Sequence, residues 1–333
     1  MSQQVVTTPL AQPAPARVQV SDAPQSSWAK ARERLAWLLV APSLLVVAIV
    51  AVYPLFQTFR LSLTNARLAS SREVEYVGLR NYQRLFEDSQ FISALWHTIV
   101  FTVTSVAAET ILGMIIALVI HSNFKGRGLV RTAMLIPWAI PTVVSSRMWA
   151  WMYQDVFGVI NDLLVVRLPQ LVDWIPGIGG TLAGIFPENK IAFTANSSTV
   201  LPAIISVDVW KTTPFMALLL LAGLQIIPDD VYEAARIDGA SKWQQFWQMT
   251  LPLLKPALLV ALIFRTLDAF RVFDIVYVMR GSAPETMTIA VYARQKLIEV
   301  QRLGLGSAAS VVIFLCIGLL VILYTRLVRV EEA

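Results

Sequence analysis

The chain has 333 residues, of which 56% are hydrophobic and only 15% are charged, and its mean hydropathy is +0.62. This composition excludes an ordinary water-soluble domain and predicts a membrane protein. The formal net charge is +5, but no basic and aromatic surface suited to nucleic acid stands out, so nucleic acid is not expected as a partner.

The residues that catalysis and metal binding require are scarce. The one cysteine, Cys316, lies in an apolar run, which excludes an internal disulfide and argues against a thiolate metal site. The histidines, His97 and His121, have no ligand-spaced partners. The chain also lacks a Gly-rich phosphate loop and a Ser-His-Asp set. We therefore expect no metal, no cofactor, no catalytic residue and no enzymatic activity in this chain.

Residues 1–30 are predicted to form a disordered cytoplasmic tail, because they are rich in Ala, Pro, Gln and Ser and show no apolar period. The tail lacks the basic start of a signal peptide, and the apolar run that follows is too long for one. The first span is therefore expected to remain as an anchor, and residues 31–333 form the transmembrane domain.

Six segments are long and apolar enough for a helix to cross a bilayer, which takes about 20 residues. The predicted fold is thus an all-α membrane protein with six transmembrane helices. Pro137, Pro141 and Pro214 predict kinked or broken helices where the backbone faces a cavity. The predicted spans are residues 35–59, 91–120, 133–153, 201–227, 256–279 and 303–325.

A long insertion, residues 154–200, separates the third and fourth predicted spans. It contains an apolar piece, residues 171–186, which is interrupted by Pro176 and by glycines. This piece is too short and too interrupted to cross the membrane easily, so we expect an interfacial or lid-like element on the extracytoplasmic side.

Orientation is only weakly indicated by charge. Lys and Arg are shared almost equally between the two sets of loops, so the overall bias does not decide it. The loop with Lys125, Arg127 and Arg131 is dense in bases and free of acids, which favours a cytoplasmic N-terminus. Six spans then place both termini and residues 228–255 in the cytoplasm.

The predicted spans contain eight charged side chains. At about 3 kcal/mol for each charge near the bilayer centre, facing all of them to lipid would cost on the order of 20 kcal/mol, so they must pair or line a wet cavity. Spacing of three residues predicts the pairs Asp208–Lys211, Arg265–Asp268 and Arg271–Asp274. The eight are Glu109, Arg147, Asp208, Lys211, Arg265, Asp268, Arg271 and Asp274.

Two interpretations of these charges remain open: salt bridges that lock helix packing, or groups that gate or line a solute path. The charges sum to zero, so nothing argues for a strongly charged solute. Trp210, like Trp149, Trp151 and Phe215, fits either a membrane-interface belt or stacking on sugar rings. The candidate path residues are Asp208, Trp210, Lys211, Arg265, Asp268, Arg271 and Asp274.

A polar stretch, residues 233–252, lies between the fourth and fifth predicted spans. Asp229 and Asp230 predict a helix start, and Gly239 predicts a left-handed corner after Ile237. Ser241 has the spacing of a capping box with Gln244, so a second helix should begin there and stop before Pro252. The result is a compact corner that exposes Glu233, Arg236, Asp238 and Lys242, unless it is only an ordinary loop between spans.

The same stretch resembles the EAA motif of permease subunits in binding-protein-dependent ABC importers. Glu233-Ala234-Ala235, Gly239 and the run from Met249 to Pro252 match its spacing, with Met249 in place of the usual Ile. Other motifs are similar to the maltose and trehalose branch: residues 210–215, 273–274, 304 and 306–308. Residues 280–284 and the length of residues 154–200 depart from it.

The resemblance implies a transport subunit, not an enzyme. It would pair with a second permease as a heterodimer in the inner membrane, take sugar from an extracytoplasmic solute-binding protein, and be driven by two ATP-binding subunits. A disaccharide such as trehalose or maltose is implied. The alternatives are a glycerol-phosphate ester carried by the same type of importer and a stand-alone ion-coupled transporter. The coupling residues would be Glu233, Ala234, Ala235, Arg236, Asp238 and Gly239.

Overall fold

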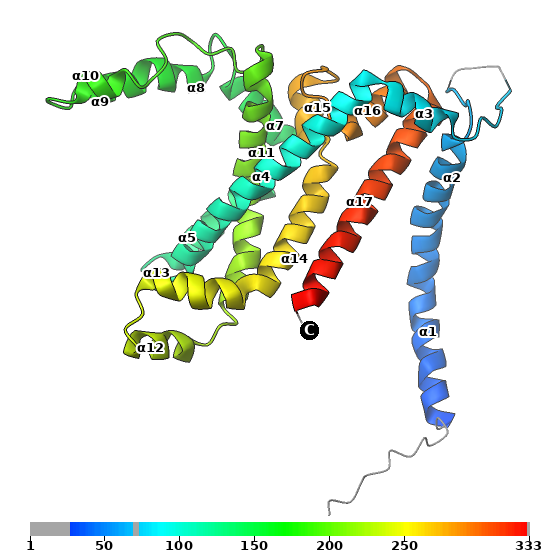
Figure 1. Ribbon diagram of the computed structural model, residues 1–333, viewed down its shortest axis with the longest axis horizontal. Coiled ribbons are helices and arrows are strands. Elements are labelled where there is room, and N and C mark those ends of the chain that lie inside the picture. The colour runs from blue at the N-terminus through cyan, green and yellow to red at the C-terminus, as the bar shows by residue number, and fades with distance from the viewer. Residues whose placement is uncertain (1–26, 69–72, 332–333) are drawn as a thin grey trace, which may run out of the picture. The chain divides into compact units, whose positions relative to one another are not determined.

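The computed structural model describes residues 27–68 and 73–331 (Figure 1). Most of the predicted tail therefore lies outside the described residues, while residues 27–30 already belong to the first helix. The chain divides into two compact units, Met1–Leu55 and Phe56–Ala333, and each is described by itself.

The described part of the first unit, residues 27–55, is one long apolar helix. It consists of α1 (Ser27–Val47), the π-helical turn η1 (Ala48–Val52) and the start of α2 (Tyr53–Ser62). The apolar stretch Lys30–Ser62 is long enough to cross a membrane and contains the predicted first span. Every described side chain of this unit is exposed, which suits an environment of lipid or of another subunit.

Four long helices form the framework of the second unit: α4 (Ser89–His121), α11 (Ser197–Leu224), α14 (Leu251–Phe270) and α17 (Leu303–Glu331). They match the second, fourth, fifth and sixth predicted spans. Helix α4 packs along α11, and α14 packs on both of them and on α17 (Figure 1). Side-chain caps begin α4 and α11, since Asp88 and Asn196 accept backbone N–H bonds at 2.9 and 3.0 Å.

The third predicted span, residues 133–153, is broken and is not one straight helix. The chain forms α5 (Arg127–Ala133), α6 (Ile136–Ala139) and α7 (Thr142–Met152), and the two halves meet at an angle of 89°. The break at Pro141 confirms the proline prediction there, since Ile140 before it is extended. Pro214, in contrast, lies inside the uninterrupted helix α11. With the bent pair counted as one span, six segments of the described residues are long and apolar enough to cross a membrane.

The fifth span also differs from its prediction. Helix α14 ends at Phe270, residues 271–273 are non-helical, and α15 (Asp274–Arg280) follows. At its other end the helical backbone runs through α13 (Lys242–Gln245) and the π-helical η3 (Phe246–Thr250) into α14, so the predicted stop before Pro252 was wrong. Pro252 is the second residue of α14, directly after the π-helical turn η3.

Short helices connect the framework. Residues 154–196 form an arm (Figure 1) with α8 (Val159–Asn161), η2 (Asp162–Arg167), α9 (Leu168–Asp173) and α10 (Gly179–Ala183), none of which is long enough to cross a membrane. Residues 197–200 of the predicted insertion already belong to α11. Asn161 fastens the base of the arm through bonds to the Asp155 and Ile191 carbonyls at 3.0 and 2.8 Å. The other connectors are α3 (Arg80–Glu87), α12 (Asp229–Ile237), α16 (Ile289–Arg294) and the π-helical η4 (Gln295–Glu299).

Candidate coupling corner and transmembrane cavity

Helices α12 and α13 form the predicted corner. Gly239 has φ of 78°, the left-handed conformation that glycine adopts most easily. The Ser241 hydroxyl accepts from the Gln244 N–H at 3.3 Å, and Gln244 Oε1 accepts from the Ser241 N–H at 2.8 Å, so the capping box is confirmed. The corner is also fixed to the following helix, because the Tyr232 and Thr250 hydroxyls are 3.1 Å apart.

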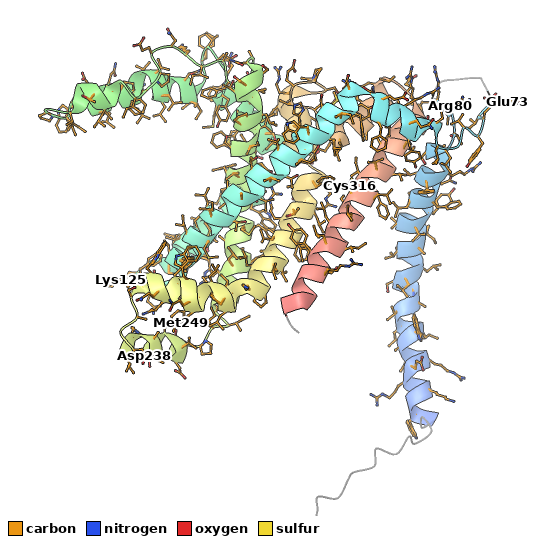
Figure 2. All side chains as sticks on the ribbon, in the orientation of Figure 1. Glu73, Arg80, Lys125, Asp238, Met249 and Cys316 are labelled. Atoms are coloured by element: carbon orange, nitrogen blue, oxygen red, sulfur yellow. The ribbon has the colours of Figure 1, made fainter. Side chains whose placement is uncertain are left out.

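Most of the predicted coupling residues share the exposed side of this corner. Glu233, Ala234, Arg236, Asp238 and Gly239 are exposed, whereas Ala235 is buried and can only support the others. Asp238 lies at the outer end of the corner, at the same end of the unit as Lys125 (Figure 2). The Glu233–Arg236 pair, at 4.0 Å and well solvated, adds little stability. The corner thus presents a small polar surface on a rigid frame.

A buried ion cluster joins three of the long helices. Arg265 of α14 donates from Nε and Nη2 to Glu109 of α4, with Nη2 2.9 Å from Oε1, and from Nη2 to Asp208 of α11. The Thr212 hydroxyl adds a bond to Glu109 at 2.7 Å. Side-chain exposure is 3%, 0% and 9% for Arg265, Glu109 and Asp208. Charges so deeply buried are tolerated because each is paired and hydrogen-bonded.

The observed pairing corrects two of the three predicted ion pairs. Arg265–Asp268 is present at 3.2 Å, as predicted. Asp208 pairs with Arg265 and not with Lys211, because the partner on a neighbouring helix is closer than the one along its own. Arg271 pairs with Asp268 at 3.3 Å and not with Asp274, because the helix breaks between Phe270 and Asp274.

Lys211 instead binds the broken third span. Its ammonium donates to the carbonyls of Pro137 and Trp138, both at 3.5 Å, and to that of Ile140. The short helix α6 ends here, so its last carbonyls lack helical partners and carry the negative end of the helix dipole. A buried cation at this point supplies the missing donors. The sequence contained an indication of this contact, because Pro137 and Pro141 predict a helix break, and a break leaves backbone carbonyls that need a hydrogen-bond donor.

A cavity of about 520 Å³ opens between α6, α11, α14 and the start of α15. Six of the seven predicted path residues line it, whereas Trp210 does not and packs edge-on against Trp149 at 5.3 Å. Trp138, which the sequence did not single out, lines the cavity and stacks on Phe215 at 5.9 Å. The lining residues include Trp138, Thr142, Asp208, Lys211, Thr212, Arg265, Asp268, Arg271, Phe273 and Asp274.

Two further observations limit the chemistry of the site. Arg147, the remaining charge of the predicted spans, is exposed on α7 and takes no part in the cavity. Across the described residues, no group of three or more His, Cys, Asp or Glu side chains could hold a metal ion. The arrangement offers a polar, water-accessible recess in an apolar framework, which suits passage of a solute.

Residues 109–330 match the family model described as "Binding-protein-dependent transport system inner membrane component". The chain belongs to this family. It is therefore a multi-pass inner-membrane component of a binding-protein-dependent transport system, and a transport subunit, not an enzyme. Membership also overturns the alternative of a stand-alone ion-coupled transporter.

Sequence similarity to other permeases extends over most of the chain. The chain is 40% identical to the trehalose transport system permease protein SugA of Mycobacterium tuberculosis over 89% of either chain. It is 42% identical to the trehalose/maltose permease MalF of Thermococcus litoralis over 89% of this chain and 94% of that one. A bacterial ABC transporter that imports alginate has the same fold, with a TM-score of 0.73 at 22% identity over 91% of this chain and 98% of that one.

Proposed function

We propose that the chain is the permease subunit of an ATP-driven importer for a disaccharide of the trehalose or maltose type. The observation that carries this proposal is its identity of 40% and 42% to permeases named for those sugars, over 89% of the chain. Identity this high over nearly the whole length favours a solute of the same class.

The cavity chemistry supports an uncharged, polyhydroxylated solute. The charges of its lining residues sum to zero. The three bases are Lys211, Arg265 and Arg271, and the three acids are Asp208, Asp268 and Asp274. Such a recess offers donors and acceptors for hydroxyl groups, and Trp138 offers a ring face for stacking. A glycerol-phosphate ester, the remaining alternative, would be better held by an excess of positive charge.

The exposed corner is the proposed contact for an ATPase. Glu233, Arg236 and Asp238 present polar groups on a rigid frame, which a moving partner requires if its displacement is to reach the membrane helices. Ala234 and Gly239 leave room for close approach, and Ala235 supports them from inside. Helices α13, η3 and α14 form one continuous backbone from the corner to the buried ion cluster. A displacement of the corner by the ATPase would therefore move the helix that carries Arg265.

The remaining parts of the assembly follow from the same proposal. A second permease as heterodimer partner would close the path, two ATP-binding subunits would bind the corners, and a solute-binding protein would deliver the sugar. We propose that both termini and the corner are cytoplasmic. The acid-free loop with Lys125, which lies at the same end of the unit as Asp238 (Figure 2), supports this orientation. The arm of residues 154–196 is then extracytoplasmic.

The test is to purify the chain with its partner subunits, reconstitute the complex in vesicles and add binding protein loaded with each sugar. Trehalose- or maltose-loaded binding protein should stimulate ATP hydrolysis and uptake of labelled sugar. A glycerol-phosphate ester should do neither. Stimulation by the ester alone would overturn the substrate proposal and leave the family membership intact.

A further inference from the structure

A second polar recess shares no lining residue with the cavity, and the proposed function does not use it. It measures about 460 Å³ and is formed by residues 64–67, by the segment leading into α3 and the first turns of α3, and by residues 302–305 at the start of α17. Arg80, labelled in Figure 2, lies at the end of the unit opposite Asp238. The recess contains four arginines, Arg67, Arg80, Arg84 and Arg302.

The arginine pocket carries more positive than negative charge, counted over the described residues that line it. All four arginines are exposed, and none makes an ion pair there. Two carboxylates also line the pocket, but Glu75 is bonded to Asn65, with Nδ2 3.2 Å from Oε2. With Glu73 as the other acid, four bases face two acids, and the pocket keeps a net charge of about +2.

A rigid frame holds the arginines around the recess. Asn81 is buried at its floor and donates to the carbonyls of Ser62 and Thr64, both at 2.8 Å. The Gly304 N–H donates to the Ala66 carbonyl at 3.0 Å, and the Leu68 N–H to the Gln301 carbonyl at 3.0 Å. These bonds join two segments that are far apart in sequence, so the pocket is a built feature of the fold.

The backbone next to Arg302 is strained in a way that supports a function. Gln301 has φ of 57°, and it is the one residue other than glycine with a positive φ in the described chain. Such strain persists where the surrounding structure imposes it, and it is concentrated at functional positions. Arg302, the next residue, lines the pocket, and its N–H bonds the Lys296 carbonyl at 2.8 Å.

We propose that the arginine pocket is a docking site for an acidic surface loop of the extracytoplasmic solute-binding protein. Arginine forks bind carboxylates bidentately, and a pocket of this size admits more than one carboxylate side chain. The inference rests on the proposed orientation, which places this end of the chain outside. The occupant is thus the partner that approaches from that side.

An anionic phospholipid fits the pocket less well. A lipid needs an apolar track for its chains next to the site for its headgroup, and the arginine pocket has none. The nearby apolar groove is lined by Leu79 and Tyr82, whereas the pocket is lined by Arg80, Asn81 and Arg84. On helix α3 these two sets lie on opposite faces, so one lipid cannot fill both.

The test uses the full complex in vesicles with its binding protein. The double variant Arg80→Gln/Arg84→Gln should raise the half-saturating concentration of binding protein for ATPase stimulation about tenfold and flatten its dependence on salt. Arg80→Lys/Arg84→Lys, which keeps the charge, should give a smaller rise. Arg326→Gln, which removes an exposed arginine of α17 outside the pocket, should leave the half-saturating concentration unchanged. Co-purification of all subunits checks that each variant assembles.

The possible failures are distinguishable. If wild-type complex shows no stimulation by any loaded binding protein, the proposed function itself fails. If wild type is stimulated and the Gln double variant has an unchanged half-saturating concentration, the docking inference is overturned. A second measurement compares the melting temperature in phosphatidylcholine vesicles with and without phosphatidylglycerol. If phosphatidylglycerol raises the melting temperature of the wild type but not of the Gln double variant, and the half-saturating concentration is the same in both, the pocket binds a lipid and the docking inference is overturned.

Discussion

Arg265 of α14 binds Glu109 of α4 through two guanidinium nitrogens, and the same side chain also reaches Asp208 of α11. One residue therefore links the three most closely packed helices of the unit. Its acidic partners are buried and have few alternatives for solvation, so the cluster holds only while the arginine is present.

Removing the arginine is expected to destabilise the helix packing strongly. Arg265→Met would leave Glu109 and Asp208 buried without a counter-charge, at a cost of about 3–5 kcal/mol. The melting temperature of the purified protein should fall by several degrees. The matched control Arg147→Met, at an exposed position on α7, should change it little. Equal effects in both variants would contradict the central role of Arg265.

Glu109 and Arg265 should behave as a coupled pair. The double variant Glu109→Gln/Arg265→Met should be less destabilised than the sum of the two single variants, because the Glu109 charge that Arg265→Met leaves unpaired is then absent. A double-mutant cycle on thermal unfolding measures the coupling. Additive effects would show that the two side chains act independently.

Loss of Lys211 should loosen the break in the third span. Lys211→Met removes the donor to the carbonyls of Pro137, Trp138 and Ile140 and should increase hydrogen exchange in residues 136–142. Uptake of sugar should fall with it, since the cavity wall becomes mobile. Lys211→Arg keeps a donor and should retain more protection. Unchanged hydrogen exchange of residues 136–142 in Lys211→Met would show that Lys211 does not stabilise the break in the third span.

The corner depends on the left-handed conformation of Gly239. Gly239→Val places a β-branched side chain at φ of 78° and should cost about 1–2 kcal/mol locally. ATP hydrolysis should then respond less to loaded binding protein while insertion in the membrane is kept. Gly239→Asn is the matched control, because asparagine tolerates this conformation. If both variants couple normally, the corner is not the contact.

Asp88, just before the α4 span, should contribute an acid-sensitive part of the stability. Burial raises its pKa, but bonds from Tyr292, the Gln90 N–H and Lys296 outweigh burial, and the net pKa is lowered from 3.8. A lowered pKa stabilises the fold above the ordinary value, and that contribution is lost as pH falls through the lowered one. Melting temperature should therefore drop less between pH 5 and about pH 3 in Asp88→Asn than in wild type.

The sequence predicted the corner better than it predicted the cavity. Gly239, Ser241 and Gln244 act through bonds within a few residues, so their spacing determines the local structure. The positions of the long helices followed from apolar length alone. The pairing of Asp208 with Arg265 depends instead on how α11 and α14 pack, and spacing along one helix carries no information about that. The break at residues 271–273 was missed because no Pro or Gly marks it.

Lys211 recognises the broken span through main-chain oxygens alone. Every residue type carries such an oxygen, so substitutions at Trp138 and Ile140 can reshape the cavity wall without removing the acceptors. The backbone contact with Lys211 and the side-chain surface that lines the cavity are therefore independent properties of residues 138–140. On the proposed solute path, a substitution at position 138 is therefore expected to change the sugar preference while the contacts of Lys211 are retained.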